Sequence, residues 1–219
     1  MAATNRGRLP FFRNMRDLFF FKRRPKMRMS KEWARPPQEE YIHKLHQEGF
    51  LTKQNWQEDD LNEYPLVTQD LADLEEYLLP TFWEFNQKAK YYQNNFYKFQ
   101  WVFMLGAFLT TVFAVLTGYY GGLTGDEVRF FLITTSKQTM VDIFGFMTAI
   151  ISAVTSYYTV LSNRHEPRKR WAGYRRLTEE LRMMYFKFLS RVDPFDRENR
   201  LDVLRKSVLE IRRQEQENG

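Results

Sequence analysis

The chain contains no cysteine among its 219 residues. Disulfides, thiolate metal sites and cysteine nucleophiles are therefore excluded. Two long stretches, residues 99–125 and residues 143–163, also lack any Asp, Glu, Lys, Arg or His. Because an ionisable side chain inside a membrane segment is the usual mark of a proton relay or a coupled transport site, this absence argues against both functions.

The sequence also lacks a recognisable active site. No Ser, His and acid trio is suggested by position, and the four glycines of residues 118–125 fit no phosphate-binding spacing. Glu40, His43 and His46 are spaced to share one helical face and could hold a divalent metal. A solvated helix yields such triplets easily, however, and no second cluster completes the site. We therefore expect no enzyme activity, no metal, no cofactor and no small-molecule substrate.

The two stretches without charge predict two membrane-spanning helices, at about residues 101–120 (WVFMLGAFLTTVFAVLTGYY) and 143–161 (IFGFMTAIISAVTSYYTVL). Each has the length that a bilayer requires, about 20 residues for a hydrocarbon core of about 30 Å. Trp or Tyr residues lie near their ends, as is typical of the membrane interface. Two buried helices of a soluble protein are the alternative, but a chain of this size seldom hides two such segments completely. The sequence predicts an all-α, two-pass integral membrane protein.

Basic residues near the span ends predict the orientation. The loop between the spans carries only Arg129 and Lys137, whereas many basic residues follow the second span. Cytoplasmic flanks are enriched in Lys and Arg, so both termini are expected in the cytosol. We expect these residues to meet anionic lipid head groups, in a plasma or inner membrane or, alternatively, an organelle membrane. They are Arg164, Arg168, Lys169, Arg170, Arg175, Arg176 and Arg182.

Apolar residues recur at steps of three and four on both flanks of the spans. The first stripe runs from Phe82 to Phe99 and continues into the first span, which predicts one helix from about Pro80 to Tyr120. The second stripe runs from Trp171 to Phe188, and Pro167 predicts a break in the helix near Asn163. Since both stripes leave the same membrane face, we expect them to pack together as a cytosolic helical stalk.

Composition divides the chain into four segments. Residues 1–31 are basic and amphipathic, suited to a membrane surface or to an organelle presequence. Residues 32–80 are acidic and predict a linker with short helices, and residues 81–195 hold the two-span domain. Residues 196–219 predict a charged C-terminal helix.

Small and hydroxyl residues follow separate lines along the spans. Small residues spaced four apart let helices approach closely in lipid, so they predict helix packing. A single hairpin uses only one face of each helix, so the hydroxyl line of the second span predicts a pore or a partner face. The packing residues are Gly106, Thr110, Ala114, Gly118, Gly145, Ala149 and Ala153; the hydroxyl face is Thr148, Ser152, Thr155, Ser156 and Thr159.

The order of these parts resembles the SLATT group, two-transmembrane effector domains associated with nucleotide-signalling systems. An aromatic and basic helix (FWEFNQKAKYYQNNFYKFQ) enters the hairpin, and the string WAGYRRLTEELRMMYFKF follows it. The resemblance covers about Pro80 to Phe195. It implies a membrane effector that oligomerises into a pore after a partner senses a signal. Its signature falls on Trp171, Tyr174, Arg175, Glu179, Glu180, Leu181 and Arg182.

Two functions follow as hypotheses. The first is a homo-oligomer that forms a pore in response to a cytosolic signal. The second is an accessory or scaffold subunit that docks onto other membrane proteins through its small-residue faces and charged tails. Nucleic-acid binding is disfavoured, because lipid head groups already account for the positions of the basic residues.

Overall fold

The computed structural model describes residues 33, 35–53, 64–130 and 133–218. The basic amphipathic segment predicted at residues 1–31 lies outside these ranges. The described chain separates into two compact units. Residues 94–165 form the hairpin unit, and residues 33–93 with 166–218 form the bundle unit. Each unit is described by itself.

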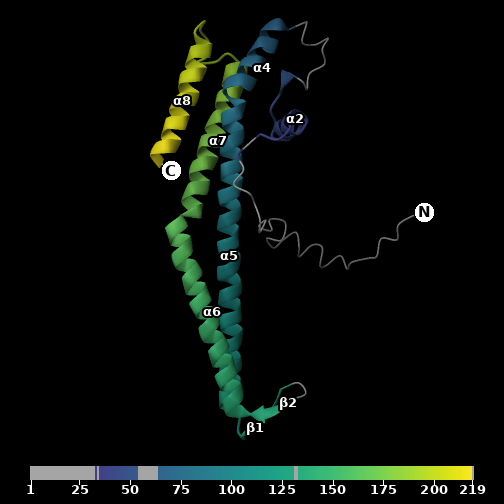
Figure 1. Ribbon diagram of the computed structural model, residues 1–219, viewed down its shortest axis with the longest axis vertical. Coiled ribbons are helices and arrows are strands. Elements are labelled where there is room, and N and C mark those ends of the chain that lie inside the picture. Colours follow the sequence, from purple (N-terminus) through teal and green to yellow (C-terminus); the bar gives the residue numbers. More distant parts are fainter. Residues whose placement is uncertain (1–32, 34, 54–63, 131–132, 219) are drawn as a thin grey trace, which may run out of the picture. The chain divides into compact units, whose positions relative to one another are not determined.

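The hairpin unit contains two long helices joined by a small sheet (Figure 1). Helix α5 (Leu79–Gly122) contributes its C-terminal part, and α6 (Lys137–His165) runs beside it. Strands β1 (Glu127–Phe130) and β2 (Ile133–Ser136) pair antiparallel between the helices. The bounds of α5 confirm the predicted helix from about Pro80 to Tyr120, whereas the sheet in the loop between the spans was not predicted.

Local interactions fix the closed end of the hairpin. The Ser136 hydroxyl accepts a 3.2 Å hydrogen bond from the Thr139 N–H, which caps the start of α6. The Lys137 ammonium donates to the Leu123 carbonyl at 2.7 Å, which satisfies a backbone oxygen just after α5. Beside these contacts, Phe144 stacks at 5.6 Å on Tyr120. This end of the unit is therefore its best-packed part.

Most of the apolar surface of the hairpin unit is exposed. Within the described ranges, two helices are long and apolar enough to cross a membrane. Only 6% of the residues in the most apolar stretch of α5 are buried. In the most apolar stretch of the helical segment that begins at Lys137, 11% of the residues are buried. A core helix of a soluble protein would be mostly buried, so this exposure favours lipid as the surrounding medium.

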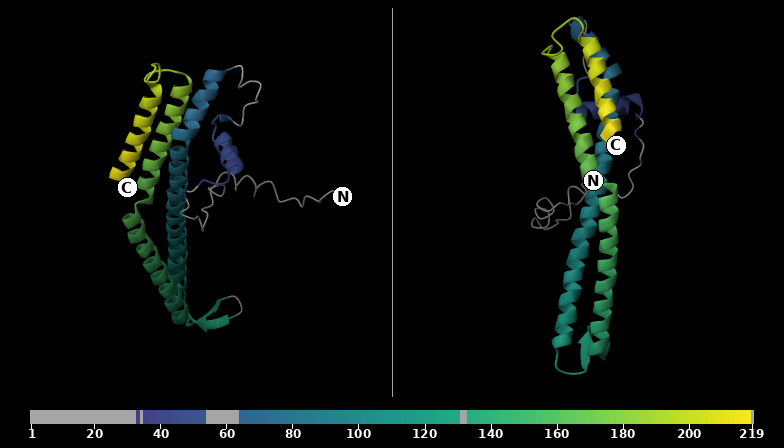
Figure 2. Two further views of the ribbon diagram at one scale, coloured as in Figure 1. Left: turned by 45° about the horizontal axis from the view of Figure 1, so that its top comes forward. Right: turned by 90° about the vertical axis from the view of Figure 1, so that its left-hand side faces the viewer.

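The bundle unit packs the N-terminal part of α5 with four further helices. These are α2 (Gln38–Gln47), α4 (Pro65–Tyr77), α7 (Pro167–Leu189) and α8 (Arg200–Asn218). Figure 2 shows α8 alongside α7. The two predicted apolar stripes meet here in one core, together with residues of α2, α4 and α8. Its fully buried side chains include Leu45, Phe50, Leu71, Leu74, Phe82, Phe85, Leu181, Tyr185, Phe188 and Leu204.

The helix break predicted near Asn163 occurs at Glu166. This residue has φ 43° and ψ 45°, the left-handed region that interrupts a helix. Pro167 is the first residue of α7, where its missing N–H and fixed φ are tolerated. The apolar helix α6 and the basic start of α7 are therefore separate helices.

The end of α2 is closed by a Schellman motif. Gly49 has φ 90°, and its N–H donates to the His46 carbonyl at 2.9 Å. The Phe50 N–H donates to the Leu45 carbonyl at 3.1 Å. The side chains of Leu45 and Phe50 are both fully buried. This backbone turn points Phe50 into the core, where its ring lies 4.4 Å from Phe82 and 4.8 Å from Tyr185.

A buried carboxylate joins α4 to the connection between α7 and α8. Asp70 is only 1% exposed and pairs with the guanidinium groups of Arg200 and Arg191. Arg191 has φ 51°, a conformation that costs a non-glycine residue about 1–2 kcal/mol. Its ion pair with Asp70, at 3.3 Å, offsets part of that cost.

The segment predicted as an acidic linker thus contributes directly to the core. It contains α2 and α4 as short helices, as expected, but their apolar residues share the core with α5 and α7. Among the described acids of this segment, Glu39 and Glu40 in the first turn of α2 are exposed, whereas Glu48, Asp73 and Glu75 are half-buried and Asp70 is buried.

We expect Phe50→Ala to destabilise the bundle unit strongly. Removing a fully buried ring leaves a cavity, which costs about 3–5 kcal/mol. Thermal unfolding of the full chain in detergent, followed by tryptophan fluorescence, measures the change. The neighbouring Leu51 is 45% exposed, so Leu51→Ala is the matched control and should lower the midpoint far less. Equal effects of the two substitutions would contradict the role of Phe50.

Candidate functional site

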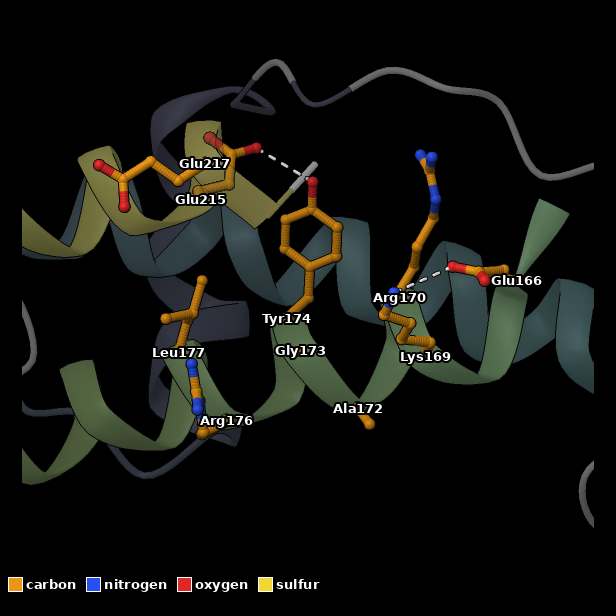
Figure 3. Close-up of a pocket in the computed structure, with 10 residues that line it drawn as sticks. All are labelled: Glu166, Lys169, Arg170, Ala172, Gly173, Tyr174, Arg176, Leu177, Glu215 and Glu217. Atoms are coloured by element: carbon orange, nitrogen blue, oxygen red, sulfur yellow. Dashed lines mark hydrogen bonds and ion pairs between the residues drawn. The ribbon is translucent and has the colours of Figure 1, made fainter.

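A groove of about 610 Å³ on the bundle unit is lined by several charged side chains (Figure 3). The groove is lined by residues from the first three turns of α7 and the last turns of α8. It therefore contains one predicted signature residue, Tyr174, together with residues of the C-terminal helix. They are Glu166, Lys169, Arg170, Ala172, Gly173, Tyr174, Arg176, Leu177, Glu215 and Glu217.

Tyr174 forms the wall of the groove. Its ring stacks on Tyr92 of α5, with centroids 5.5 Å apart and planes 3° from parallel. Its hydroxyl donates to the Glu215 carboxylate at 3.0 Å, as Figure 3 shows. Burial, followed by the negative charge of Glu215, raises the pKa of Tyr174 well above its ordinary value. The phenol therefore stays protonated and holds α7 to α8.

The acidic groups of the groove are already paired. Lys88 of α5 lies 2.7 Å from Glu215, and Arg213 lies 3.2 Å from Glu217. Lys169 lies 3.3 Å from Glu166, although both side chains are largely exposed.

Two arginines of the groove lack acidic partners. Within the described ranges, no carboxylate lies within 4.0 Å of the guanidinium group of Arg170 or Arg176. Arg170 donates instead to the neutral Tyr92 hydroxyl at 3.3 Å. The groove lining carries three cations and three carboxylates, and within the described ranges the two cations without a carboxylate partner are Arg170 and Arg176.

The remaining signature residues lie on different sides of α7. Leu181 is fully buried in the core, whereas Trp171 is half-buried and Glu180 is exposed. Arg175 and Glu179 form an exposed ion pair one turn apart, as expected for that spacing.

Arg182 connects α7 to the end of α2. It lies 3.1 Å from Glu48 and 3.4 Å from Glu179, and its guanidinium lies 5.7 Å from the Phe50 ring centroid. Glu48 also accepts a 2.8 Å hydrogen bond from Lys90 of α5. Glu48 was not among the predicted residues, although the Gly49-Phe50 pair after a short amphipathic helix indicates the turn that positions it.

The hairpin unit distributes the predicted packing residues unevenly. Gly106 is buried and packs closely against Thr155. A Cβ at this position would lie 2.3 Å from the Thr155 hydroxyl, so no larger residue fits here unless Thr155 shifts. Thr110, Thr148 and Thr155 are half-buried, so part of the predicted hydroxyl face lies inside the hairpin. The packing positions Ala114, Gly118, Gly145, Ala149 and Ala153 are exposed, as are Ser152, Ser156 and Thr159 of the hydroxyl face.

Glu40, His43 and His46, whose spacing could suit a metal ion, have other contacts. Glu40 pairs with Lys44, and the His43 ring nitrogen lies 2.9 Å from the Gln47 amide nitrogen. Over the part of the chain that the structure describes, no group of three or more His, Asp or Glu residues is placed to hold a metal ion.

The chain belongs to the DUF4231 family, described as proteins of unknown function, whose model matches residues 83–202. The match includes both apolar helices and the whole of α7. No curated protein and no solved structure matches the chain.

We expect Glu48→Gln to weaken the pH dependence of stability in acid. Burial alone would raise the pKa of Glu48, but hydrogen bonds from Lys90 and Asn86 and the charge of Arg182 lower it below its ordinary value of 4.5. The stabilisation is therefore fully present above pH 4.5 and is lost as the pH falls through the lower folded-state pKa.

Thermal midpoints of the full chain between pH 7 and pH 3 test this expectation. The wild-type midpoint should fall more steeply below pH 4.5 than that of Glu48→Gln. At neutral pH the variant should be less stable by about 1–3 kcal/mol, because Arg182 loses a charged partner. Glu180→Gln, at an exposed position, is the control. Parallel curves for wild type and Glu48→Gln would refute the role of Glu48.

Proposed function

We propose that the protein is a non-enzymatic integral membrane protein that self-associates through its hairpin and forms a pore in response to a cytosolic signal. One observation carries the proposal: in the most apolar stretches of the two candidate membrane helices only 6% and 11% of the residues are buried, while the bundle unit has an ordinary buried core. Lipid and further helices are the partners that such a surface requires. This function agrees with the resemblance to the SLATT group, which we retain as part of the proposal.

The proposed partner of α6 is a second copy of this chain. The contact with α5 uses the side of α6 that carries Thr148 and Thr155. Gly145, Ala149 and Ala153 lie on a different, exposed side, and a Cβ at Gly145 would meet no atom within 4 Å. In lipid, a line of small residues lets an identical line approach closely, which suits a symmetric contact between copies.

The proposed topology places both termini in the cytosol. Its support is the excess of basic residues after α6 compared with the loop between α5 and α6. In this arrangement the bundle unit is cytosolic and available to a signal, and the β1–β2 sheet lies outside.

Single-cysteine labelling tests the topology, since the natural chain has no cysteine to interfere. We expect Thr124→Cys, in the exposed loop before β1, to react with a membrane-impermeant maleimide on intact cells. Ser190→Cys, exposed at the end of α7, should react only after the membrane is permeabilised. The opposite pattern would reverse the topology, and labelling of both sites on intact cells would exclude a spanning hairpin.

Oxidative cross-linking in native membranes tests self-association. We expect Ala149→Cys to form disulfide-linked dimers, because a symmetric contact brings the same position of two copies together. Ala107→Cys, exposed on α5 outside the small-residue line, is the matched control and should stay monomeric. Equal cross-linking of both variants would contradict the interface. Copurification of unrelated membrane subunits in fixed ratio, without dimers, would favour the accessory-subunit function instead.

A further inference from the structure

Gly173 has an unusual set of neighbours on α7. Residues three and four positions apart are adjacent on a helix surface. For Gly173 these are Lys169, Arg170, Arg176 and Leu177, so three of its four neighbours are cations. All four line the groove together with Gly173 itself.

The glycine leaves open space among these cations. A Cβ at this position would meet no atom within 4 Å, so packing within the described chain does not require glycine. Gly173 lies inside a helix of 23 residues and has no positive φ, so its conformation does not require glycine either. Glycine destabilises a helix interior relative to alanine. The remaining physical use of a glycine here is the close approach of another group to the helix backbone.

The charges indicate what that group is. Among the acids of the groove, Glu215 shares Lys88 with Glu84, and Glu217 shares Arg213 with Glu210 at the exposed surface. Arg170 and Arg176 have no carboxylate within 4.0 Å among the described residues, and Arg170 can keep its hydrogen bond to Tyr92 because a guanidinium has five N–H donors. Lys169 pairs with Glu166 at 3.3 Å at the exposed surface, so a bound anion would compete with that carboxylate for its ammonium. Two arginines without a carboxylate partner, beside this lysine, suit a doubly charged oxyanion.

We propose that the groove around Gly173 binds a phosphomonoester group, with Lys169, Arg170 and Arg176 as its ligands. Guanidinium groups match phosphate oxygens in charge and in geometry. The absence of a side chain at Gly173 lets the phosphate rest on the helix between them. The Tyr174 ring and Leu177 supply an apolar wall for the organic part of the ligand.

Two sources can supply this phosphoryl group. One is the head group of a lipid such as phosphatidic acid. In the sequence, Gly173 follows Pro167 by six residues, and Pro167 follows the last residue of α6 by two. The other source is a soluble phosphomonoester. The lipid source rests on the proposed membrane insertion, whereas the soluble source does not.

Binding in neutral detergent tests the site with the full chain. The probes are glycerol 3-phosphate, dioctanoyl phosphatidic acid and dioctanoyl phosphatidylserine, titrated calorimetrically at about 0.1 M salt. Gly173→Leu fills the groove and keeps every charge, and Arg176→Gln removes one ligand. Arg168→Gln is the matched control, because this exposed arginine of α7 does not line the groove. Unchanged or raised thermal midpoints of Gly173→Leu establish that the fold is intact.

We expect both Gly173→Leu and Arg176→Gln to bind a phosphomonoester about tenfold more weakly. Gly173→Leu fills the space for the phosphate, and Arg176→Gln removes one charged hydrogen bond. Arg168→Gln should keep the wild-type preference for phosphatidic acid over phosphatidylserine. Binding of glycerol 3-phosphate with this pattern supports a soluble source, and the same pattern for phosphatidic acid alone supports a lipid source.

Three results would overturn the proposal. They are no binding of either phosphomonoester, equal binding of phosphatidic acid and phosphatidylserine, and equal losses in Arg168→Gln and Arg176→Gln with none in Gly173→Leu. Because the assay needs neither a bilayer nor an oligomer, failure of the proposed pore would leave its result unchanged.

Discussion

The bundle unit depends on the packing of aromatic rings between α5 and α7. Phe82 and Phe85 from α5 and Tyr185 and Phe188 from α7 are fully buried in one core. Phe50 fills the space between two of these rings, and the Tyr185 hydroxyl donates to the Leu51 carbonyl at 2.6 Å. The turn after α2 is therefore attached to both long helices at once. The stacking of Tyr174 on Tyr92 of α5 also requires α5 and α7 to keep this spacing.

The sequence was sufficient to predict the long helices of both units, because their apolar residues recur regularly over many turns. It also predicted the break before α7, since Pro167 restricts the residue that precedes it. It did not predict that α2 and α4 share the core. Their composition is acidic and each contributes only a few apolar residues, so local pattern cannot distinguish a packed short helix from a linker. The pairing of Asp70 with Arg191 and Arg200 depends on residues more than a hundred positions apart, which no local pattern relates.

Which face of each hairpin helix contacts the other helix could likewise not be predicted from the sequence. Periodicity identified lines of small and hydroxyl residues, but the rotation of each helix about its axis decides which line faces the other helix. Here the contact between Gly106 and Thr155 and the stacking of Phe144 on Tyr120 fix that rotation. They bring Thr155 toward α5 and leave Ala149 exposed. A prediction from spacing alone could find both lines but could not choose between them.

The candidate site follows from how the chain distributes its charge. The basic start of α7 was predicted as a membrane anchor, and that interpretation treats its cations as equivalent. In the folded bundle they are not equivalent, because Arg175 has an ion pair with Glu179 while Arg170 and Arg176 have no carboxylate partner within the described ranges. The acids of α8 that line the groove contact Lys88 and Arg213, which they share with Glu84 and Glu210. A general attraction to lipid would not need this separation, whereas a groove that keeps its cations unpaired around Gly173 is suited to one particular anion.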